Sequence, residues 1–301
     1  MSDDFRRVTF DLPGGAMAGI ALGRETPNPD IVLLHATGFN ARAYRAMLAP
    51  LGERYHVLAL DLRGHGRTRL PNHLWGYASW RQHADDVAKV LESHFTAPAT
   101  LAGHSLGATV ALLLAGRRPD LTASLALIEP VVQNASFYTA IQVLGATTMM
   151  RALFPLARAA RKRRNVFPDR ETAVRAFSGR SVFKAFTREM IEDYVADGLI
   201  EDGRGAFKLA CTPAYEAATF AAQRHDPWAA LRRGLCPMVL LRAERYSTVS
   251  HGAFRRIAAM RPDARMATVE GAGHMLPMER PDRVRAAIES AVLMRRGGSL
   301  S

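Results

Sequence analysis

The sequence is poor in cysteine and has no long apolar run. Cys211 and Cys236 are the only cysteines among 301 residues. Neither has the spacing of a metal site, so we expect two buried thiols in a reducing cytoplasm. No run of about 18 uninterrupted apolar residues occurs, which argues against a membrane span, and no secretory signal is expected at the start of the chain. These absences predict a cytoplasmic globular protein, and 48% hydrophobic residues are ample for its core.

Acidic residues are scarce relative to basic ones. The 40 Lys and Arg residues outnumber 28 Asp and Glu, which gives a formal net charge of +12. The dense basic run comprises Arg158, Arg161, Lys162, Arg163 and Arg164. It could attract anionic lipid, an acidic substrate or nucleic acid, or it could be the solvated face of a surface helix. Because interleaved aromatic residues and known nucleic-acid modules are missing, no nucleic-acid partner is predicted, whereas peripheral membrane contact stays open.

Short apolar runs alternate with helix-like stretches along most of the chain. Residues 8–11 and 17–22 predict a leading hairpin. Continuous apolar runs, typical of strands covered on both faces, lie at residues 30–35, 57–60, 100–102, 125–128, 238–241 and 266–269. Helical patterns lie at residues 44–51, 80–94, 106–116, 253–260 and 281–293. The alternation predicts an α/β fold with a mostly parallel, doubly wound sheet and chemistry at the carboxyl ends of its strands.

One interval breaks this alternation. Between about residues 130 and 224 we find amphipathic stretches and no clear buried strand, and the interval is too long for an ordinary loop. The amphipathic stretches lie at residues 140–158, 170–177 and 183–198. We interpret residues 131–225 as a helical cap inserted between two parts of the core, residues 1–130 and 226–294. Residues 295–301 are expected to be a flexible tail.

Residues 100–107 carry the strongest motif. An apolar run leads into Gly103-His104-Ser105-Leu106-Gly107, and a helix-like Ala/Leu-rich segment follows. A strand that turns directly into a helix forces the serine into a strained conformation and requires small neighbours two residues away on each side. The pattern therefore predicts a nucleophile elbow that exposes the Ser105 hydroxyl at the end of the sheet. The start of the following helix aims N–H groups at the same spot.

A serine nucleophile needs a base and an oxyanion hole. His274 lies in a glycine-rich loop just after the last predicted strand, so we predict that it is the base. The loop after the first buried strand, which begins at His35, is predicted to supply an oxyanion donor in addition to the Leu106 N–H. Thr37 is the preferred donor, and Gly38 and Phe39 are the alternatives because the register of the loop is open.

The order of these motifs resembles that of the α/β-hydrolase superfamily. The motifs are His35 with Gly38, residues 61–68, the elbow at residues 103–107, and residues 271–281. The resemblance spans residues 30–130 and 226–294. It implies the α/β-hydrolase fold with an inserted cap and favours the serine-nucleophile branch of esterases and lipases. It says little about the substrate, because the superfamily also contains thioesterases, lactonases, perhydrolases and hydrolases of C–C bonds.

The acid of the triad departs from the family pattern. Relatives usually carry an aspartate a few residues after the strand at 238–241, where this chain has Tyr246 and Ser247. Two carboxylates remain. Glu129 ends the preceding strand, a position from which some lipases of the superfamily supply their acid, and Glu244 lies early in the usual loop. We favour Glu129 and keep Glu244 as the alternative.

These residues predict a serine hydrolase that cleaves an ester or thioester of a fairly hydrophobic acid through an acyl-enzyme. No metal or organic cofactor is implied, and the partner is a small-molecule substrate. Side chains expected near the substrate are those of Phe39, His104, Phe137 and Met275. Apolar cap residues could line a pocket or simply pack together. Alternatives are C–C bond hydrolysis on the same triad and a weakly catalytic ligand-binding protein.

Overall fold

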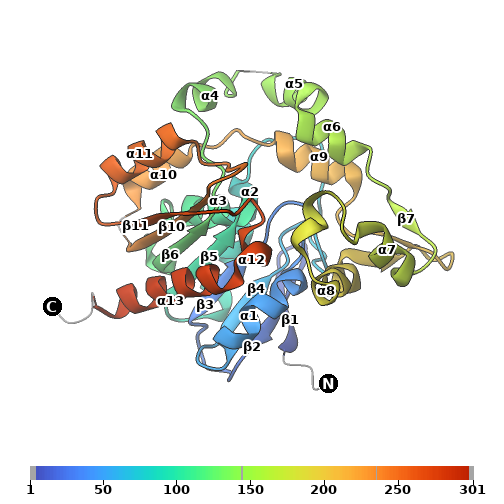
Figure 1. The fold of residues 1–301 in the computed structure, drawn as a ribbon, viewed down its shortest axis with the longest axis horizontal. Helices are drawn as coiled ribbons and strands as arrows, with labels where there is room; N and C mark the ends of the chain where they lie inside the picture. Colours follow the sequence, from blue (N-terminus) through green and yellow to red (C-terminus); the bar gives the residue numbers. More distant parts are fainter. Residues whose placement is uncertain (1–4, 144, 235, 298–301) are drawn as a thin grey trace.

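The computed structural model describes residues 5–143, 145–234 and 236–297. An eight-stranded sheet with the order β1-β2-β4-β3-β5-β6-β10-β11 forms its centre (Figure 1). Pairing is antiparallel for β1 with β2 and for β2 with β4, and parallel elsewhere. The strands are β1 Phe5–Leu12, β2 Gly15–Leu22, β3 Ile31–Leu34, β4 Val57–Leu60, β5 Ala99–His104, β6 Thr122–Ile128, β10 Met238–Ala243 and β11 Arg265–Val269.

Helices cover both faces of this sheet. They are α1 Arg45–Gly52, α2 Arg81–His94, α3 Leu106–Ala115, α10 Pro227–Arg233, α11 His251–Met260 and α13 Pro281–Gly297. Side chains of β3 alternate between two cores: Val32 and Leu34 pack with α2 and α3, and Ile31 and Leu33 pack with α1 and α13. Because both faces are covered, every residue of β3 and β4 is buried. The predicted mostly parallel α/β fold is confirmed.

The last helix is longer than the sequence pattern indicates. Helix α13 runs to Gly297, so residues 295–297 belong to a helix and the expectation of a flexible tail is wrong for them. Apolar residues stop marking the pattern after Leu293, whereas the helical backbone continues by its own hydrogen bonds. The rest of the expected tail, residues 298–301, lies outside the described residues.

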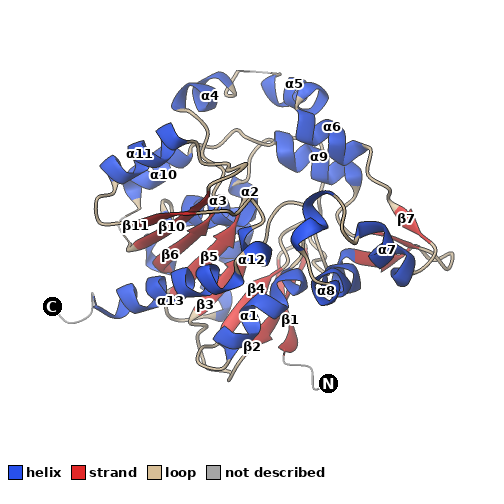
Figure 2. Cartoon of the chain, viewed as in Figure 1, coloured by secondary structure: helices blue, strands red, loops and turns tan. Residues whose placement is uncertain are grey.

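The insertion between β6 and β10 combines helices with a small sheet (Figure 2). Its helices are α4 Ala135–Ala140, α5 Ala146–Leu153, α6 Pro155–Arg161, α7 Arg170–Phe177, α8 Arg188–Gly198 and α9 Pro213–Ala221. The short helix α12 Leu276–Glu279 belongs to the core and follows β11. The strands β7 Val166–Phe167, β8 Leu199–Glu201 and β9 Phe207–Leu209 form an antiparallel sheet. We did not predict this sheet, because strands of two or three residues are too short for a periodic pattern. The predicted stretch 140–158 is interrupted near Gly145 and Pro155.

Ion pairs hold the insertion against the core. Asp193 and Asp197 lie one turn apart on α8 and are both buried. Asp193 accepts hydrogen bonds from Arg42 Nε (2.9 Å) and Arg45 Nε (2.7 Å), and Asp197 accepts one from Arg7 (2.7 Å). These arginines belong to the core, so α8 is tied to it by charge-assisted bonds between segments far apart in the chain.

Five buried histidines and one buried aspartate couple stability to pH. Burial disfavours the charged form of each group. It lowers the pKa of His65 to about 4 and the pKa of His104 and His225 to about 3. The same desolvation lowers the pKa of His35 and His83 well below the usual value. In the opposite direction, burial raises the pKa of Asp61 to about 7.

We therefore expect the protein to lose stability as the pH falls below about 6.5. In that range the unfolded chain binds protons on these imidazoles and the folded chain does not. For each such proton, the free energy of unfolding falls by about 1.4 kcal/mol per pH unit. Asp61 acts in the opposite direction between about pH 7 and pH 4. There only the folded state binds a proton at Asp61, which cancels the destabilising effect of one histidine proton. Urea unfolding at constant ionic strength from pH 7.5 to pH 5 measures the slope. A flat profile would contradict the burial of neutral histidines.

Candidate active site

The elbow at Ser105 has the geometry that the motif predicts. Strand β5 ends at His104, Ser105 adopts φ 54°, and α3 begins at Leu106. A Cβ on Gly103 would lie 2.3 Å from the backbone carbon of Gly107, and one on Gly107 would lie 2.0 Å from the Leu34 carbonyl oxygen in β3. Both glycines are therefore required for the turn to fit against the neighbouring strand. The strained residue is the one that carries the hydroxyl group.

Three polar side chains from distant segments form one hydrogen-bonded row. His274 follows β11, and its Nε2 lies 3.0 Å from Ser105 Oγ. Its Nδ1 lies 2.9 Å from Oε2 of Glu129 at the end of β6. The order hydroxyl, imidazole, carboxylate is the arrangement that activates a serine, because the carboxylate holds the imidazole in the tautomer that accepts the serine proton.

Glu129 is held firmly in this row. Its side chain is fully buried and its backbone φ is 52°, so it is a second non-glycine residue with positive φ at a strand end. Its carboxylate accepts three further hydrogen bonds, from Ala243 N–H (2.5 Å), Ser247 Oγ–H (2.6 Å) and Thr248 N–H (3.1 Å). Four donors thus surround one carboxylate, which fixes its orientation toward His274.

Glu244, the alternative acid, serves a different contact. Its side chain is exposed, and Oε2 accepts the Gly271 N–H at 2.8 Å. Its own N–H donates to the Val269 carbonyl at 3.2 Å. Glu244 therefore pins the loop that leads to His274, and the structure brings Glu129 to the imidazole. The sequence analysis did not predict that Thr248 supports Glu129. The hydroxyl residues Ser247 and Thr248, which stand where relatives usually carry an aspartate, were the available indication of hydrogen-bond donors to a carboxylate from another strand.

In the described structure, one backbone N–H among residues 36–39, which follow β3, has no acceptor. The other three N–H groups have acceptors: Ala36 donates to Tyr44 Oη (3.1 Å), Gly38 to His65 Nε2 (3.0 Å) and Phe39 to the Ala36 carbonyl (3.1 Å). Among the described residues, the Thr37 N–H and the Leu106 N–H have no acceptor. Thr37 lies in the loop after β3, and Leu106 begins α3 after β5; these two strands pair with each other. Backbone N–H groups without an acceptor, one of them on the residue directly after Ser105, suit a developing oxyanion.

His104 and Tyr44 connect these loops. His104 Nε2 donates to the His274 carbonyl (2.9 Å), and Nδ1 accepts from Tyr44 Oη (2.7 Å), which in turn accepts the Ala36 N–H (3.1 Å). Burial lowers the pKa of His104 to about 3, so the ring is neutral, and the carbonyl partner assigns the proton to Nε2. The expected substrate contact of His104 is wrong, because the ring is fully buried and both nitrogens are occupied.

We expect Tyr44→Phe to lower kcat with little change in KM. The change removes the acceptor of the Ala36 N–H and the donor to His104, and a buried polar group left unpaired costs about 1–3 kcal/mol. If that cost appears in the transition state, kcat falls about ten- to hundredfold. Steady-state kinetics provide the measurement, and Tyr138→Phe, a buried tyrosine of the insertion, is the matched control. A change confined to thermal stability would contradict a positioning role.

The other residues expected near substrate lie in different surroundings. Phe39 is buried in an aromatic cluster of the insertion, with ring centroids 5.7 Å from Phe186 and 5.4 Å from Tyr194. Phe137 is half-buried on α4, and Met275 is buried directly after His274. Phe39 thus connects the loop after β3 to the insertion.

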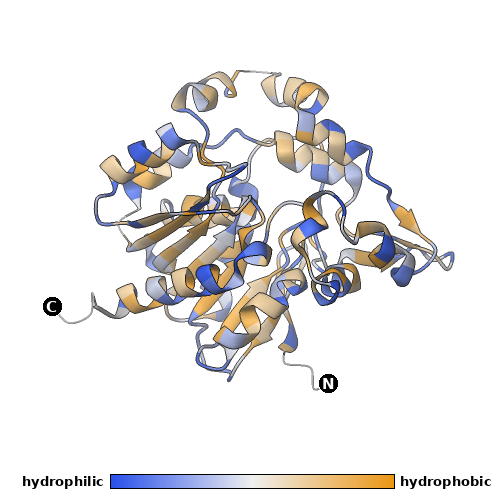
Figure 3. Ribbon diagram, in the orientation of Figure 1, coloured by the Kyte–Doolittle hydropathy of each residue, from blue (hydrophilic) through white to orange (hydrophobic). Residues whose placement is uncertain are grey.

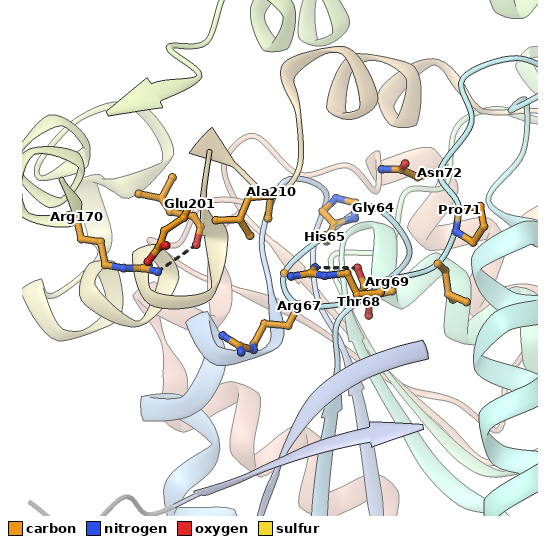
Figure 4. A pocket seen from close by; sticks show the side chains of 14 residues that line it. Gly64, His65, Arg67, Thr68, Arg69, Pro71, Asn72, Arg170, Glu201 and Ala210 are labelled. Carbon is orange, nitrogen blue, oxygen red and sulfur yellow. Dashed lines mark hydrogen bonds between the residues drawn. The ribbon is translucent and has the colours of Figure 1, made fainter. Parts of the chain in front are cut away.

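The structure contains a hollow of about 740 Å³ (Figure 4). It separates the Gly64–Asn72 loop from the insertion, where Arg170 and Glu201 line the opposite wall. Ser105, His274 and Glu129 are not among the residues that line it.

The described residues contain no helix with the length and apolar character of a membrane span. In the same residues, no group of three or more His, Cys, Asp or Glu side chains has a metal-binding arrangement.

Comparison with known families agrees with this geometry. The model of the alpha/beta hydrolase family matches residues 31–287, which is most of the chain. The chain belongs to the alpha/beta hydrolase family. The mostly parallel sheet and the inserted helices agree with this membership. The protein is therefore a hydrolase, but membership of the family does not define which bond it cleaves.

Similar proteins act on different bonds. The 2-(acetamidomethylene)succinate hydrolase of Mesorhizobium japonicum is 26% identical over 91% of this chain and 94% of its own length. The pimeloyl-[acyl-carrier protein] methyl ester esterase of Chromobacterium violaceum is 39% identical over 33% of this chain and 36% of its own length. The crystal structure of E-2-(acetamidomethylene)succinate hydrolase superposes with a TM-score of 0.78 at 24% identity, covering 96% of this chain and 99% of that one. That likeness shows the fold.

Proposed function

We propose that this α/β hydrolase cleaves esters or thioesters of fairly hydrophobic carboxylic acids through an acyl-enzyme. The observation that carries the proposal is the row of Ser105, His274 and Glu129, with distances of 3.0 and 2.9 Å between successive polar atoms. An activated serine beside free N–H groups is suited to acyl transfer. The similarity to a methyl ester esterase over a third of the chain supports an ester substrate.

In the proposed mechanism each group has one role. Ser105 Oγ attacks the carbonyl carbon while His274 Nε2 takes its proton, and Glu129 stabilises the imidazolium through Nδ1–H. The N–H groups of Thr37 and Leu106 hold the oxyanion of the tetrahedral intermediate. His274 then returns the proton to the leaving alcohol or thiol, which leaves an acyl-Ser105. Water, deprotonated by the same imidazole, releases the acid and regenerates the serine.

Labelling and a substrate panel test this proposal. A fluorophosphonate probe is expected to modify the wild-type protein at Ser105, identified by peptide mass spectrometry, because the probe reacts with an activated serine. Turnover of p-nitrophenyl and coenzyme A esters is expected to rise with acyl chain length before it levels off. An unlabelled wild-type protein would instead favour a ligand-binding protein on the same fold.

A second candidate is hydrolysis of a carboxylate-bearing substrate that is not an ester. It is supported by the similarity to 2-(acetamidomethylene)succinate hydrolase over 91% of the chain and by one cationic group. A Cβ on Gly38 would lie 3.3 Å from Arg163 Nη1, so this guanidinium adjoins the loop that carries Thr37. Arg163 already donates to Glu216 and Tyr194, which favours the neutral ester. Succinate-type amides and C–C bond substrates in the same panel distinguish the candidates.

A further inference from the structure

The far end of the insertion exposes apolar side chains that the core does not use. Six of the ten large apolar side chains that are exposed in the described part of the chain lie in two segments, residues 74–75 and 143–156. We call these six residues the apolar tip: Leu74, Trp75, Val143, Met149, Leu153 and Leu156. Trp75 is 94% exposed and Leu153 is 64% exposed. Such clustering marks an interaction site, whereas single exposed apolar residues are ordinary.

The two segments of the apolar tip are joined. Arg151 of α5 donates to the carbonyl oxygens of Leu74 (2.9 Å) and Tyr77 (2.5 Å), which ties α5 to the loop that carries Trp75. Met149 and Leu153 are four residues apart and share one face of α5. None of the residues of α5 is buried. Figure 3 shows mostly apolar colouring on α4 and α5, which lie at the top of the molecule and away from the sheet.

The surroundings of the apolar tip are cationic. Residues 131–168 contain six Arg and Lys residues and no Asp or Glu, and residues 62–84 also contain no acidic residue. Arg158, Arg161 and Lys162 are exposed at and just after the end of α6. Asp85 lines the same hollow as Trp75 and is paired with Arg117 (2.5 Å). An exposed tryptophan among aliphatic side chains, with cations on the adjoining α6, suits the interface of an anionic bilayer. There the ring lies at headgroup level and the cations meet lipid phosphates.

We propose that the apolar tip docks this protein onto an anionic membrane surface. Docking inserts Trp75, Met149 and Leu153 among the lipid headgroups, and Arg158, Arg161 and Lys162 pair with phosphate oxygens. The binding step makes no use of the triad, and it is therefore independent of the proposed hydrolysis.

The chain contains its own reporter for this step. Of its three tryptophans, Trp80 and Trp228 are 2% exposed and only Trp75 faces solvent. Full-length Ser105→Ala protein, which keeps the apolar tip and does not hydrolyse the probe, is mixed with vesicles of phosphatidylglycerol and phosphatidylcholine. We expect a blue shift of tryptophan emission, co-sedimentation with the vesicles, and loss of both at high salt. Vesicles of phosphatidylcholine alone are expected to bind much less.

Matched variants separate docking from general stickiness. Met149→Glu with Leu153→Glu is expected to weaken vesicle binding at least tenfold. Leu293→Glu, a change of an exposed leucine on α13, is expected to leave it unchanged. Arg158→Glu with Arg161→Glu should abolish the preference for phosphatidylglycerol, and Arg283→Glu should not. The proposal is overturned if the wild-type protein does not bind the vesicles. It is also overturned if Leu293→Glu weakens binding as much as Met149→Glu with Leu153→Glu does. Self-association that the Met149 and Leu153 changes abolish would assign the apolar tip to a second copy and also overturns it.

Discussion

Ser105→Ala is expected to reduce kcat on the order of 10⁶-fold, because no other group in the row can form the acyl-enzyme. Fluorophosphonate labelling should disappear with it. The alanine removes only the hydroxyl group that lies 3.0 Å from His274 Nε2, so the fold and the thermal midpoint should stay close to those of the wild-type protein. Kinetics on the best ester of the panel, with enzyme purified from a fresh column to exclude contaminants, provide the measurement.

The control for this change is Ser136→Ala, at an exposed position on α4. It should leave turnover and labelling intact. Retention of labelling in Ser105→Ala would mean that the probe reacts elsewhere. Retention of turnover would remove the serine mechanism and leave only the family membership.

Glu129→Gln is expected to cost on the order of 10⁴ in kcat, because the acid no longer fixes the His274 tautomer or stabilises the imidazolium. The geometry strengthens this expectation. One carboxylate oxygen faces the Ala243 N–H and the other faces the Thr248 N–H. Wherever the amide NH₂ is placed, it meets a backbone donor that cannot rotate away, so a buried donor is left unpaired. Thermal unfolding should therefore also shift downward.

Glu244→Gln is the matched control for the acid. Its amide oxygen can still accept the Gly271 N–H that Glu244 Oε2 accepts at 2.8 Å, so the effect on kcat should be small. Since Ser247 Oγ lies 2.6 Å from Glu129 Oε1, adding Ser247→Asp to Glu129→Gln is expected to restore part of the activity by placing a carboxylate nearby. Equal mild losses in the two glutamine variants would contradict the assignment of Glu129.

Several features of the site were predictable because their signals are local. The requirement for a small residue at Gly103 comes from a backbone contact at the elbow itself, since a Cβ there would lie 2.3 Å from the backbone carbon of Gly107. The apolar runs of β3 and β4 lie in the interior of the sheet, so they show no alternation and are recognisable as buried strands. The positions of Ser105 and His274 at strand ends follow from the alternation of strands and helices along the chain.

Other features depend on partners far along the chain. His104 looked like a neighbour of the substrate, yet its ring bonds to Tyr44, 60 residues earlier, and to the backbone of His274, 170 residues later. The small sheet of β7, β8 and β9 has strands of two or three residues, and its pairing depends on the packing of the insertion. Such contacts leave no periodic trace in the local sequence.

The sequence by itself determined the α/β fold, the nucleophile elbow and the loop of the base, because backbone sterics and hydrophobic periodicity act between neighbouring residues. It left two carboxylates and three oxyanion donors open. Only the tertiary structure shows which carboxylate contacts His274 and which N–H group of the loop has no acceptor. Parallel pairing of β6 with β10 brings Glu129 against the loop of Ser247 and under His274. Hydrogen bonds to Tyr44, His65 and the Ala36 carbonyl occupy every N–H of the loop at residues 36–39 except that of Thr37 within the described structure. These choices depend on distances between segments that lie apart in the sequence, and only the folded chain brings those segments together.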